Sequence, residues 1–255
     1  MRRPPLVLAY HGLGHFARGL DPYRLMVAPE AFRAHVRNLR GRGYEFVSLA
    51  RFVADMRDGG PRPGTCALTF DDGTEDNASV LLDILTQEDL PATIFVCPGL
   101  LGAPHFAMPA EARVRLMTAD ELRELAASPL VDLGSHTRRH TTLEHATAEE
   151  ALKEMTASKV ALEELIDRPV TAFAYPLGGY SPAAPEAARR AGYDCAVTSG
   201  NLGGWTPYDL CREPIDSLDG RLTFALKSRG LWKGLRSSAP GRVMRRVVRP
   251  LRHRA

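Results

Sequence analysis

The sequence lacks the features of a membrane-spanning or disulfide-stabilised protein. No stretch approaches the roughly 18 apolar residues that a spanning helix needs. The four cysteines are widely separated and form no C-x-x-C pair, which indicates a reducing compartment and no disulfide framework. After the basic start, only residues 6–10 form an apolar run, too few for the core of a signal peptide. We therefore expect a cytoplasmic protein.

Acidic residues are absent from the end of the chain. Residues 221–255 hold eleven of the 33 Lys and Arg residues and none of the 30 Asp and Glu residues. The first 220 residues therefore carry 22 basic and 30 acidic side chains, and the net charge of +3 describes neither part. We predict a domain at 1–220 and a tail at 221–255. The tail mixes leucine, valine and tryptophan with arginine, which suits peripheral contact with an anionic membrane. A solvated or docking tail is an equal alternative, and nucleic-acid binding is a weaker one.

Short apolar runs alternate with helical patterns along the rest of the chain. The helical pattern after Pro29 is typical, with apolar residues at Phe32, Val36 and Leu39 on one face. Two capping boxes, Thr118-x-x-Glu121 and Thr147-x-x-Glu150, mark further helix starts. This alternation predicts parallel strands with crossover helices and a closed or nearly closed α/β barrel. The seven strands that we expect cover residues 6–10, 45–49, 66–70, 92–96, 130–133, 171–175 and 195–198.

Two adjacent carboxylates follow one of these strands. The run 66–70 ends in Asp71-Asp72-Gly73, where the strand breaks into a loop and both side chains can turn toward one pocket. Two such acids can divide the chemistry, one binding a metal ion and the other handling protons. Asp and Gly are also ordinary turn residues, so this loop alone does not decide the function.

A pair of histidines follows another strand. His136 and His140 come after the apolar run 130–133, and a spacing of four lets one turn or tight loop aim both imidazoles at one point. With Asp72 they would supply three protein ligands and leave an open position, the pattern of a catalytic metal site. His11 also follows a predicted strand. The carboxyl ends of parallel barrel strands share one face, so these groups are expected to converge there.

The segments Thr69–Gly73 and His136–His140 together resemble the first two motifs of the polysaccharide deacetylases, the NodB-homology domain of carbohydrate esterase family four. The resemblance spans roughly residues 5–215. It implies a distorted (β/α) barrel and a hydrolase that uses a divalent metal to remove N-acetyl groups from glycans containing N-acetylglucosamine. Asp72, His136 and His140 would hold the metal, usually zinc, with cobalt and nickel as alternatives. Asp71 would be the general base that activates water.

The chain departs from the family pattern in its third motif. Where the family commonly has Arg-Pro-Pro-Tyr-Gly, this sequence has Ala174–Gly178, so Ala174 replaces the arginine that steadies the base. The backbone N–H of Leu177 remains a candidate donor to the oxyanion, because that role needs no particular side chain. We hypothesise that Arg212, placed after the last strand region, approaches Asp71 instead.

The general acid is a second departure. The family's usual Leu-x-His near the end of the domain is absent, whereas Leu8–His11 resembles the permuted version found in poly-N-acetylglucosamine deacetylases. Imidazoles titrate near neutral pH, so His11 is our candidate to protonate the leaving amine. Four further histidines before the tail lack a strand-end context, and we interpret them as surface or loop residues: His15, His35, His105 and His145.

Three aromatic residues lie in loops that are expected on the same rim. Tyr175, Tyr180 and Trp205 are candidates to stack on sugar rings, although buried packing explains each of them equally well. Two other functions remain open. One is an enzyme of the same fold that hydrolyses another C–N bond, and the other is a non-catalytic glycan-binding protein. Retention of Asp71, both ligand histidines and His11 favours the enzyme.

Overall fold

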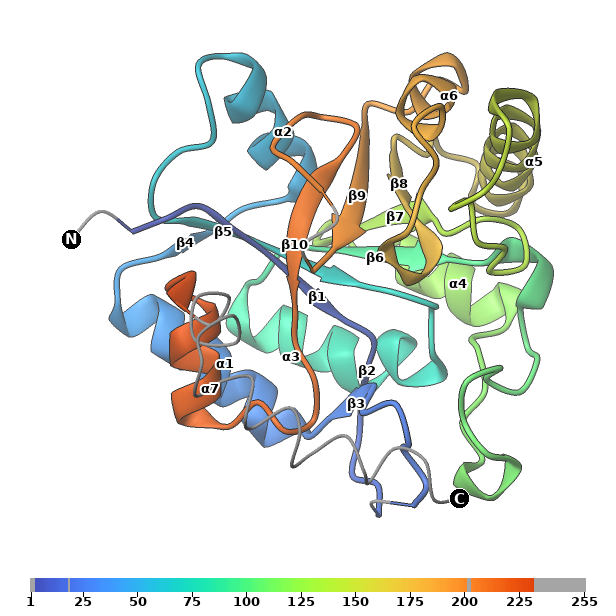
Figure 1. Cartoon of the computed structure of the whole chain (residues 1–255). Helices are drawn as coiled ribbons and strands as arrows, with labels where there is room; N and C mark the ends of the chain where they lie inside the picture. Colours follow the sequence, from blue (N-terminus) through green and yellow to red (C-terminus); the bar gives the residue numbers. More distant parts are fainter. Residues whose placement is uncertain (1–2, 18, 201–202, 232–255) are drawn as a thin grey trace, which may run out of the picture.

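The computed structural model describes residues 3–17, 19–200 and 203–231 (Figure 1). Its strands are β1 (Leu6–Tyr10), β2 (Gly12–Leu13), β3 (Met26–Val27), β4 (Glu45–Phe46), β5 (Thr65–Phe70), β6 (Ala92–Val96), β7 (Val131–Ser135), β8 (Ala172–Ala174), β9 (Cys195–Ser199) and β10 (Leu210–Pro214). Its α-helices are α1 (Pro29–Gly41), α2 (Leu49–Arg57), α3 (Val80–Glu88), α4 (Ala119–Ala126), α5 (Ala148–Ile166), α6 (Ala184–Arg190) and α7 (Arg221–Lys227). Four 3-10 turns occur in the loops: η1 (Glu75–Ala78), η2 (Pro98–Leu100), η3 (Ala110–Ala112) and η4 (Pro176–Gly178).

Seven parallel strands close into a barrel. Each pairs with the next in the order β1-β10-β9-β8-β7-β6-β5, and a further parallel pairing of β1 with β5 completes the ring. Helices α1, α3 and α7 lie on one side of the barrel and α4, α5 and α6 on the other (Figure 1). The helices cover the outer face of the strands and the inner face lines the packed barrel interior, which explains why β1 and β5 are buried along their whole length. The predicted (β/α)7-type barrel is confirmed.

The membership of the ring differs from the sequence prediction. The expected strand at 45–49 forms only the two-residue β4, which pairs with β5 outside the ring. The seventh barrel strand is instead β10, which was not among the predicted strands. Its sequence, Leu-Cys-Arg-Glu-Pro, conceals the strand because a buried arginine, Arg212, occupies an inward position where an apolar residue is expected.

Helix α2 covers the amino-terminal end of the barrel. Its residues Val53 and Arg57 line a crevice together with Thr93, Ala172 and Cys195, which lie at or next to the starts of β6, β8 and β9. The Arg57 guanidinium also donates a 2.7 Å hydrogen bond to the carbonyl of Asp194, just before β9. Because α2 closes the amino-terminal end, a functional site of the barrel is expected at the carboxyl-terminal end.

Helix α7 begins directly after the predicted domain boundary at residue 220. It packs against α1 and so forms part of the folded domain. Phe224 is buried and its ring stacks on that of His35 in α1, with ring centroids 3.9 Å apart. His35 Nε2 donates to the carbonyl of Asp219 at 2.7 Å, and its Nδ1 accepts from the Tyr10 hydroxyl at 3.2 Å. The prediction that His35 is a surface or loop residue is therefore wrong. The rest of the predicted tail, residues 232–255, lies outside the described residues.

Candidate active site

The two sequence motifs lie at the carboxyl-terminal end of the barrel, as their positions after strands predict. Asp71 directly follows β5, and its backbone N–H donates to the carbonyl of Tyr10 at the end of β1. His136 directly follows β7, and its N–H donates to the carbonyl of Val96 at the end of β6. These backbone bonds extend the barrel pairing by one residue into the loops. Both motifs are therefore held by the rigid barrel.

Asp72, His136 and His140 form a compact cluster. One ligand atom from each lies within 4.8 Å of the other two. Asp72 Oδ1 is 3.6 Å from His136 Nε2 and 3.4 Å from His140 Nε2, and this buried oxygen has no hydrogen-bond donor. A buried carboxylate oxygen without a donor is costly unless a cation satisfies it. Two imidazoles and a carboxylate are a donor set that zinc prefers, so these residues fit a divalent metal ion.

The protonation of His136 also suits metal binding. Its Nδ1 lies 2.8 Å from the carbonyl oxygen of Ala174, which can only accept, so Nδ1 carries the proton. The Nε2 lone pair is thereby left facing Asp72 and His140. Burial, followed by the neighbouring His136, lowers the pKa of His140 to about 4, so this imidazole is neutral at physiological pH. His140 can therefore act as a ligand without first losing a proton, and the neutral His136 tautomer set by Ala174 offers its Nε2 lone pair to a metal ion.

Backbone strain is concentrated around this cluster. Among the described residues, eight non-glycine residues have positive φ, and four of them lie in the site loops: Asp72, Thr137, His140 and Leu177. Each such residue costs about 1–3 kcal/mol and persists only where the surrounding structure holds it in place. Two of the three candidate ligands are thus fixed in a left-handed conformation. This strain fits a site that the fold prearranges.

Asp71 is paired with Arg212. The Arg212 guanidinium donates to both carboxylate oxygens of Asp71, each at 2.7 Å, and both side chains are buried. Burial raises the pKa of the Asp71 carboxyl, but the charge of Arg212 and the bonds that it donates outweigh burial and hold that pKa below its ordinary value. Asp71 is therefore a carboxylate at neutral pH.

Arg212 is itself anchored by groups around the barrel interior. Its Nε donates to the carbonyl of Thr198 at 3.0 Å, and the guanidinium also forms hydrogen bonds with the hydroxyls of Thr69 and Ser199. The structure thus places Arg212 against Asp71. Arg212 lies within β10, whereas the sequence prediction placed it after the last strand. At the usual motif position, Ala174 contributes only its carbonyl, which orients His136.

His11 and Leu177 lie at the same end of the barrel. His11 directly follows β1. Burial raises the pKa of Asp71 and Asp72, their hydrogen-bond donors Arg212 and His105 lower it, and the nearby His11 lowers it further. Its backbone carbonyl accepts a hydrogen bond from Asn77 Nδ2 at 3.2 Å. Leu177 lies in the turn after β8 with φ 59° and an exposed side chain. The catalytic roles of both residues remain predictions.

The three residues predicted to stack on sugar rings differ in burial and in position. Tyr175 is fully buried and donates to the carbonyl of Tyr208, so its ring cannot contact a substrate. Trp205 is 50% exposed, but its ring lies 6.3 Å from that of Phe52 in α2, toward the opposite end of the barrel. Both predictions are wrong, because the position of an aromatic in a post-strand loop does not tell which way the loop turns. Tyr180 is partly exposed and stacks on Tyr175 with ring centroids 4.7 Å apart, so it stays a candidate.

Two site residues were missed by the sequence prediction. His105 was interpreted as a surface or loop residue, but its side chain is buried and its Nε2 lies 3.2 Å from Asp72 Oδ2. The neighbouring Phe106 is 45% exposed, and its ring lies 4.3 Å from that of His140. The signal that could have found them is the apolar content of the Pro/Gly-rich segment 98–109, which is unusual for a solvated loop. His15 and His145 are exposed, as expected.

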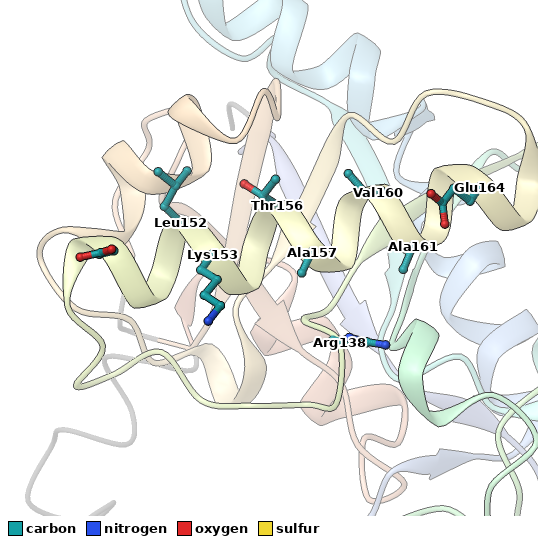
Figure 2. Close-up of a pocket in the computed structure, with 9 residues that line it drawn as sticks. Arg138, Leu152, Lys153, Thr156, Ala157, Val160, Ala161 and Glu164 are labelled. Carbon is teal, nitrogen blue, oxygen red and sulfur yellow. The ribbon is translucent and has the colours of Figure 1, made fainter.

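The basic residues between the two candidate ligand histidines face away from the cluster. Arg138 and Arg139 are exposed, whereas His136 is buried. Arg138 lines a shallow groove along the outer face of α5, beside Lys153, Ala157 and Ala161 (Figure 2). This groove contains none of the clustered carboxylates or imidazoles, so it is separate from the site described above.

A further buried carboxyl, Asp76, lies beside the His11 loop. Its Oδ2 accepts from the backbone N–H of Leu13 at 2.6 Å and from Asn77 Nδ2 at 3.0 Å, while its Oδ1 has no donor. Burial is the main cause that raises the pKa of Asp76 to about 6. Between about pH 4 and pH 6 the folded protein therefore holds a proton on Asp76 that the unfolded chain has already lost.

We predict that Asp76→Asn stabilises the protein at pH 8 but not at pH 4. The folded-state pKa is raised, so the wild-type protein loses stability as the pH rises from about 4 to about 6. Two pKa units correspond to roughly 3 kcal/mol, and asparagine, which has no charge, avoids this loss. Thermal unfolding of both proteins at the two pH values tests this. An equal difference in melting temperature at both values would contradict it.

Fold and site together define a (β/α) barrel with a candidate metal centre and a buried carboxylate–arginine pair at its carboxyl-terminal end. The sequence profile of the family described as polysaccharide deacetylase matches residues 58–196, more than half of the chain. The chain therefore belongs to the polysaccharide deacetylase family. His11 and Arg212 lie outside the matched residues: His11 directly follows β1, and Arg212 lies within β10.

Known proteins agree with this assignment. A putative polysaccharide deacetylase, YxkH of Bacillus subtilis (strain 168), is 26% identical over 194 residues, which cover 76% of this chain and 63% of that protein. The match thus spans less than two thirds of the relative. IcaB from Ammonifex degensii has the same fold with a TM-score of 0.72 and 19% identity, covering 90% of this chain and 97% of the other. The Streptococcus pyogenes deacetylase PplD, solved in complex with acetate, gives a TM-score of 0.73 at 24% identity, with coverages of 89% and 99%.

Proposed function

We propose that this protein is a metal-dependent hydrolase that removes N-acetyl groups from glycans of the N-acetylglucosamine type. The observation that carries the proposal is the pairing of two adjacent carboxylates with different partners. Asp71 is bound by Arg212, whereas Asp72 faces His136 and His140. One acid is thus arranged for proton transfer and the other for binding a cation. Membership in the deacetylase family supports the choice of an acetamido group as the bond that is hydrolysed.

The residues divide the chemistry as follows. A bound zinc ion would act as a Lewis acid toward the amide carbonyl and would acidify water. Asp71, ionised at neutral pH, accepts the proton of the attacking water, and Arg212 fixes the plane of its carboxylate. Each carboxylate oxygen has a second lone pair, so the bidentate pair with Arg212 leaves an acceptor site for this proton. His11 then protonates the leaving amine, and the backbone N–H of Leu177 donates to the oxyanion.

Acetate release from N-acetylglucosamine oligomers by the purified protein tests the proposal. We expect release that a chelator abolishes and that zinc restores. Release of formate from N-formyl analogues, without release of acetate, would instead assign hydrolysis of another C–N bond. Binding of the oligomers without any hydrolysis would point to a glycan-binding protein.

We also infer that the chain contacts an anionic lipid surface near the carboxyl-terminal end of the barrel. None of the described helices is long and apolar enough to cross a bilayer, so the contact would be peripheral. Leu218 and Leu222, which follow β10, are 62% and 82% exposed. The same segment is joined to the loop before β3 by a hydrogen bond from the N–H of Ser217 to the carbonyl of Arg24. Residues 221–255 add eleven basic and no acidic side chains.

Co-sedimentation of the full-length protein with vesicles tests this contact. We expect pelleting with phosphatidylglycerol-containing vesicles and not with pure phosphatidylcholine vesicles. Replacing Leu218 and Leu222 by aspartate should weaken the binding by about tenfold, equivalent to ~1.4 kcal/mol. Val160→Asp, at an exposed position of α5, is the matched control. Equal pelleting of all three proteins, or of the wild type with both kinds of vesicle, would contradict the inference. Truncation at residue 220 is unsuitable, because it removes the buried Phe224.

A further inference from the structure

His105 holds one oxygen of Asp72. The His105 side chain is buried, and its Nδ1 accepts a hydrogen bond from the backbone N–H of Ala107 at 3.1 Å. Because Nδ1 accepts, the neutral imidazole carries its proton on Nε2. This Nε2–H is directed at Asp72 Oδ2, 3.2 Å away. The tautomer of His105 is thus set by the backbone, and His105 acts as a donor toward Asp72.

The two oxygens of Asp72 therefore have different surroundings. Oδ2 is occupied by His105, whereas Oδ1 has no donor and faces the Nε2 atoms of His136 and His140. We propose that His105 is a positioning residue that presents Asp72 to a divalent cation through Oδ1 alone. This inference rests on the proposed metal site, but not on which substrate the enzyme hydrolyses.

The segment that carries His105 is tied to the Asp72 loop by backbone bonds. The N–H of His105 donates to the carbonyl of Val114 at 2.9 Å, and the N–H of Met117 donates to the carbonyl of Gly73 at 3.0 Å. An antiparallel bridge also joins Thr74 to Leu116. The segment 103–117 therefore forms a rigid support next to the Asp72-Gly73 turn, where both residues have positive φ. A side chain on such a support can fix the carboxylate more tightly than a mobile loop would.

The conservative replacement is glutamine. In a His105→Gln variant the side-chain amide nitrogen can occupy the place of Nε2 and donate to Asp72, whereas His105→Ala removes the donor. Residues that orient metal ligands typically change metal affinity by about 10–100-fold when they are removed. We expect zinc to bind about 10–100-fold more weakly to His105→Ala, and within about threefold of wild type to His105→Gln. Zinc affinity is measured by competition with a chromophoric chelator, without any substrate.

Two further measurements separate positioning from a general loss of fold. His145→Ala, at an exposed histidine outside the site, should bind zinc as the wild type does. In the cobalt-loaded proteins, His105→Ala should show weaker visible absorption, because a freed carboxylate can bind through both oxygens and raise the coordination number. Wild-type zinc affinity in His105→Ala would overturn the proposal, as would equal losses in the alanine and glutamine variants. Failure of the wild type to bind any divalent ion would overturn it together with the metal site.

Discussion

Asp71→Asn is expected to lower the rate of acetate release by about 10²–10⁴-fold, the range that a positioned general base contributes. Asparagine has nearly the same shape but cannot accept a proton from water. The zinc affinity should remain close to that of the wild type, because Asp72, His136 and His140 are untouched. The measurement is steady-state release of acetate, corrected for the folded fraction of each protein.

The correction is needed because the same change disturbs the ion pair with Arg212. An amide at position 71 offers only one acceptor oxygen to the buried guanidinium, so some loss of stability will accompany the loss of activity. Asp72→Asn is the companion variant, and it should lose zinc as well as activity. Activity of Asp71→Asn within about tenfold of wild type would contradict the role of Asp71 as the base.

Arg212→Ala is expected to have the largest effect on stability. It leaves the buried carboxylate of Asp71 without its partner, which typically costs about 3–5 kcal/mol. The carboxylate would also lose its fixed orientation, and a misplaced catalytic group costs about 10²-fold in rate. Arg212→Lys keeps the charge but not the two parallel hydrogen bonds, so we expect intermediate values. Denaturant unfolding and acetate release are the two readouts.

The exchange of two residues tests whether Arg212 replaces the arginine that the third motif lacks. Ala174 lies in the same buried core cluster as Leu210, which is on β10 two residues before the buried Arg212. Positions 174 and 212 are therefore both in the barrel interior. The double variant Arg212→Ala with Ala174→Arg keeps one arginine there, and we expect it to recover part of the activity lost in Arg212→Ala. Arg229→Ala, at an exposed arginine of the described chain, is the control. Near-normal turnover of Arg212→Ala would discard the role of this arginine.

The sequence predicted the parts of the fold that depend on local pattern. Strands β1, β5 and β6 are predominantly apolar and buried along their whole length, because both of their faces are covered. Both predicted capping boxes form, at the starts of α4 and α5. The convergence of Asp71, Asp72 and the two candidate ligand histidines also followed from sequence, because both motifs begin directly after a strand of a parallel barrel. Local signals were enough at these positions.

Contacts between distant segments could not be predicted in the same way. Strand β10 carries an arginine in the barrel interior, which is stable only because Asp71, 141 residues away, neutralises it. His105 and His35 are buried because each finds hydrogen-bond partners on other elements. Nothing near them in the sequence indicates these partners. The direction of the loops that carry Tyr175 and Trp205 is likewise set by tertiary packing.

Zinc add-back to the metal-free protein tests the central claim most directly. The protein is stripped with a chelator, and acetate release from N-acetylglucosamine oligomers is followed as zinc is returned. We expect no release without metal, and a rise that stops at about one zinc ion per chain, as one Asp-His-His cluster requires. Acetate release that persists in the stripped protein, or a fully zinc-loaded protein that releases none, would contradict the account.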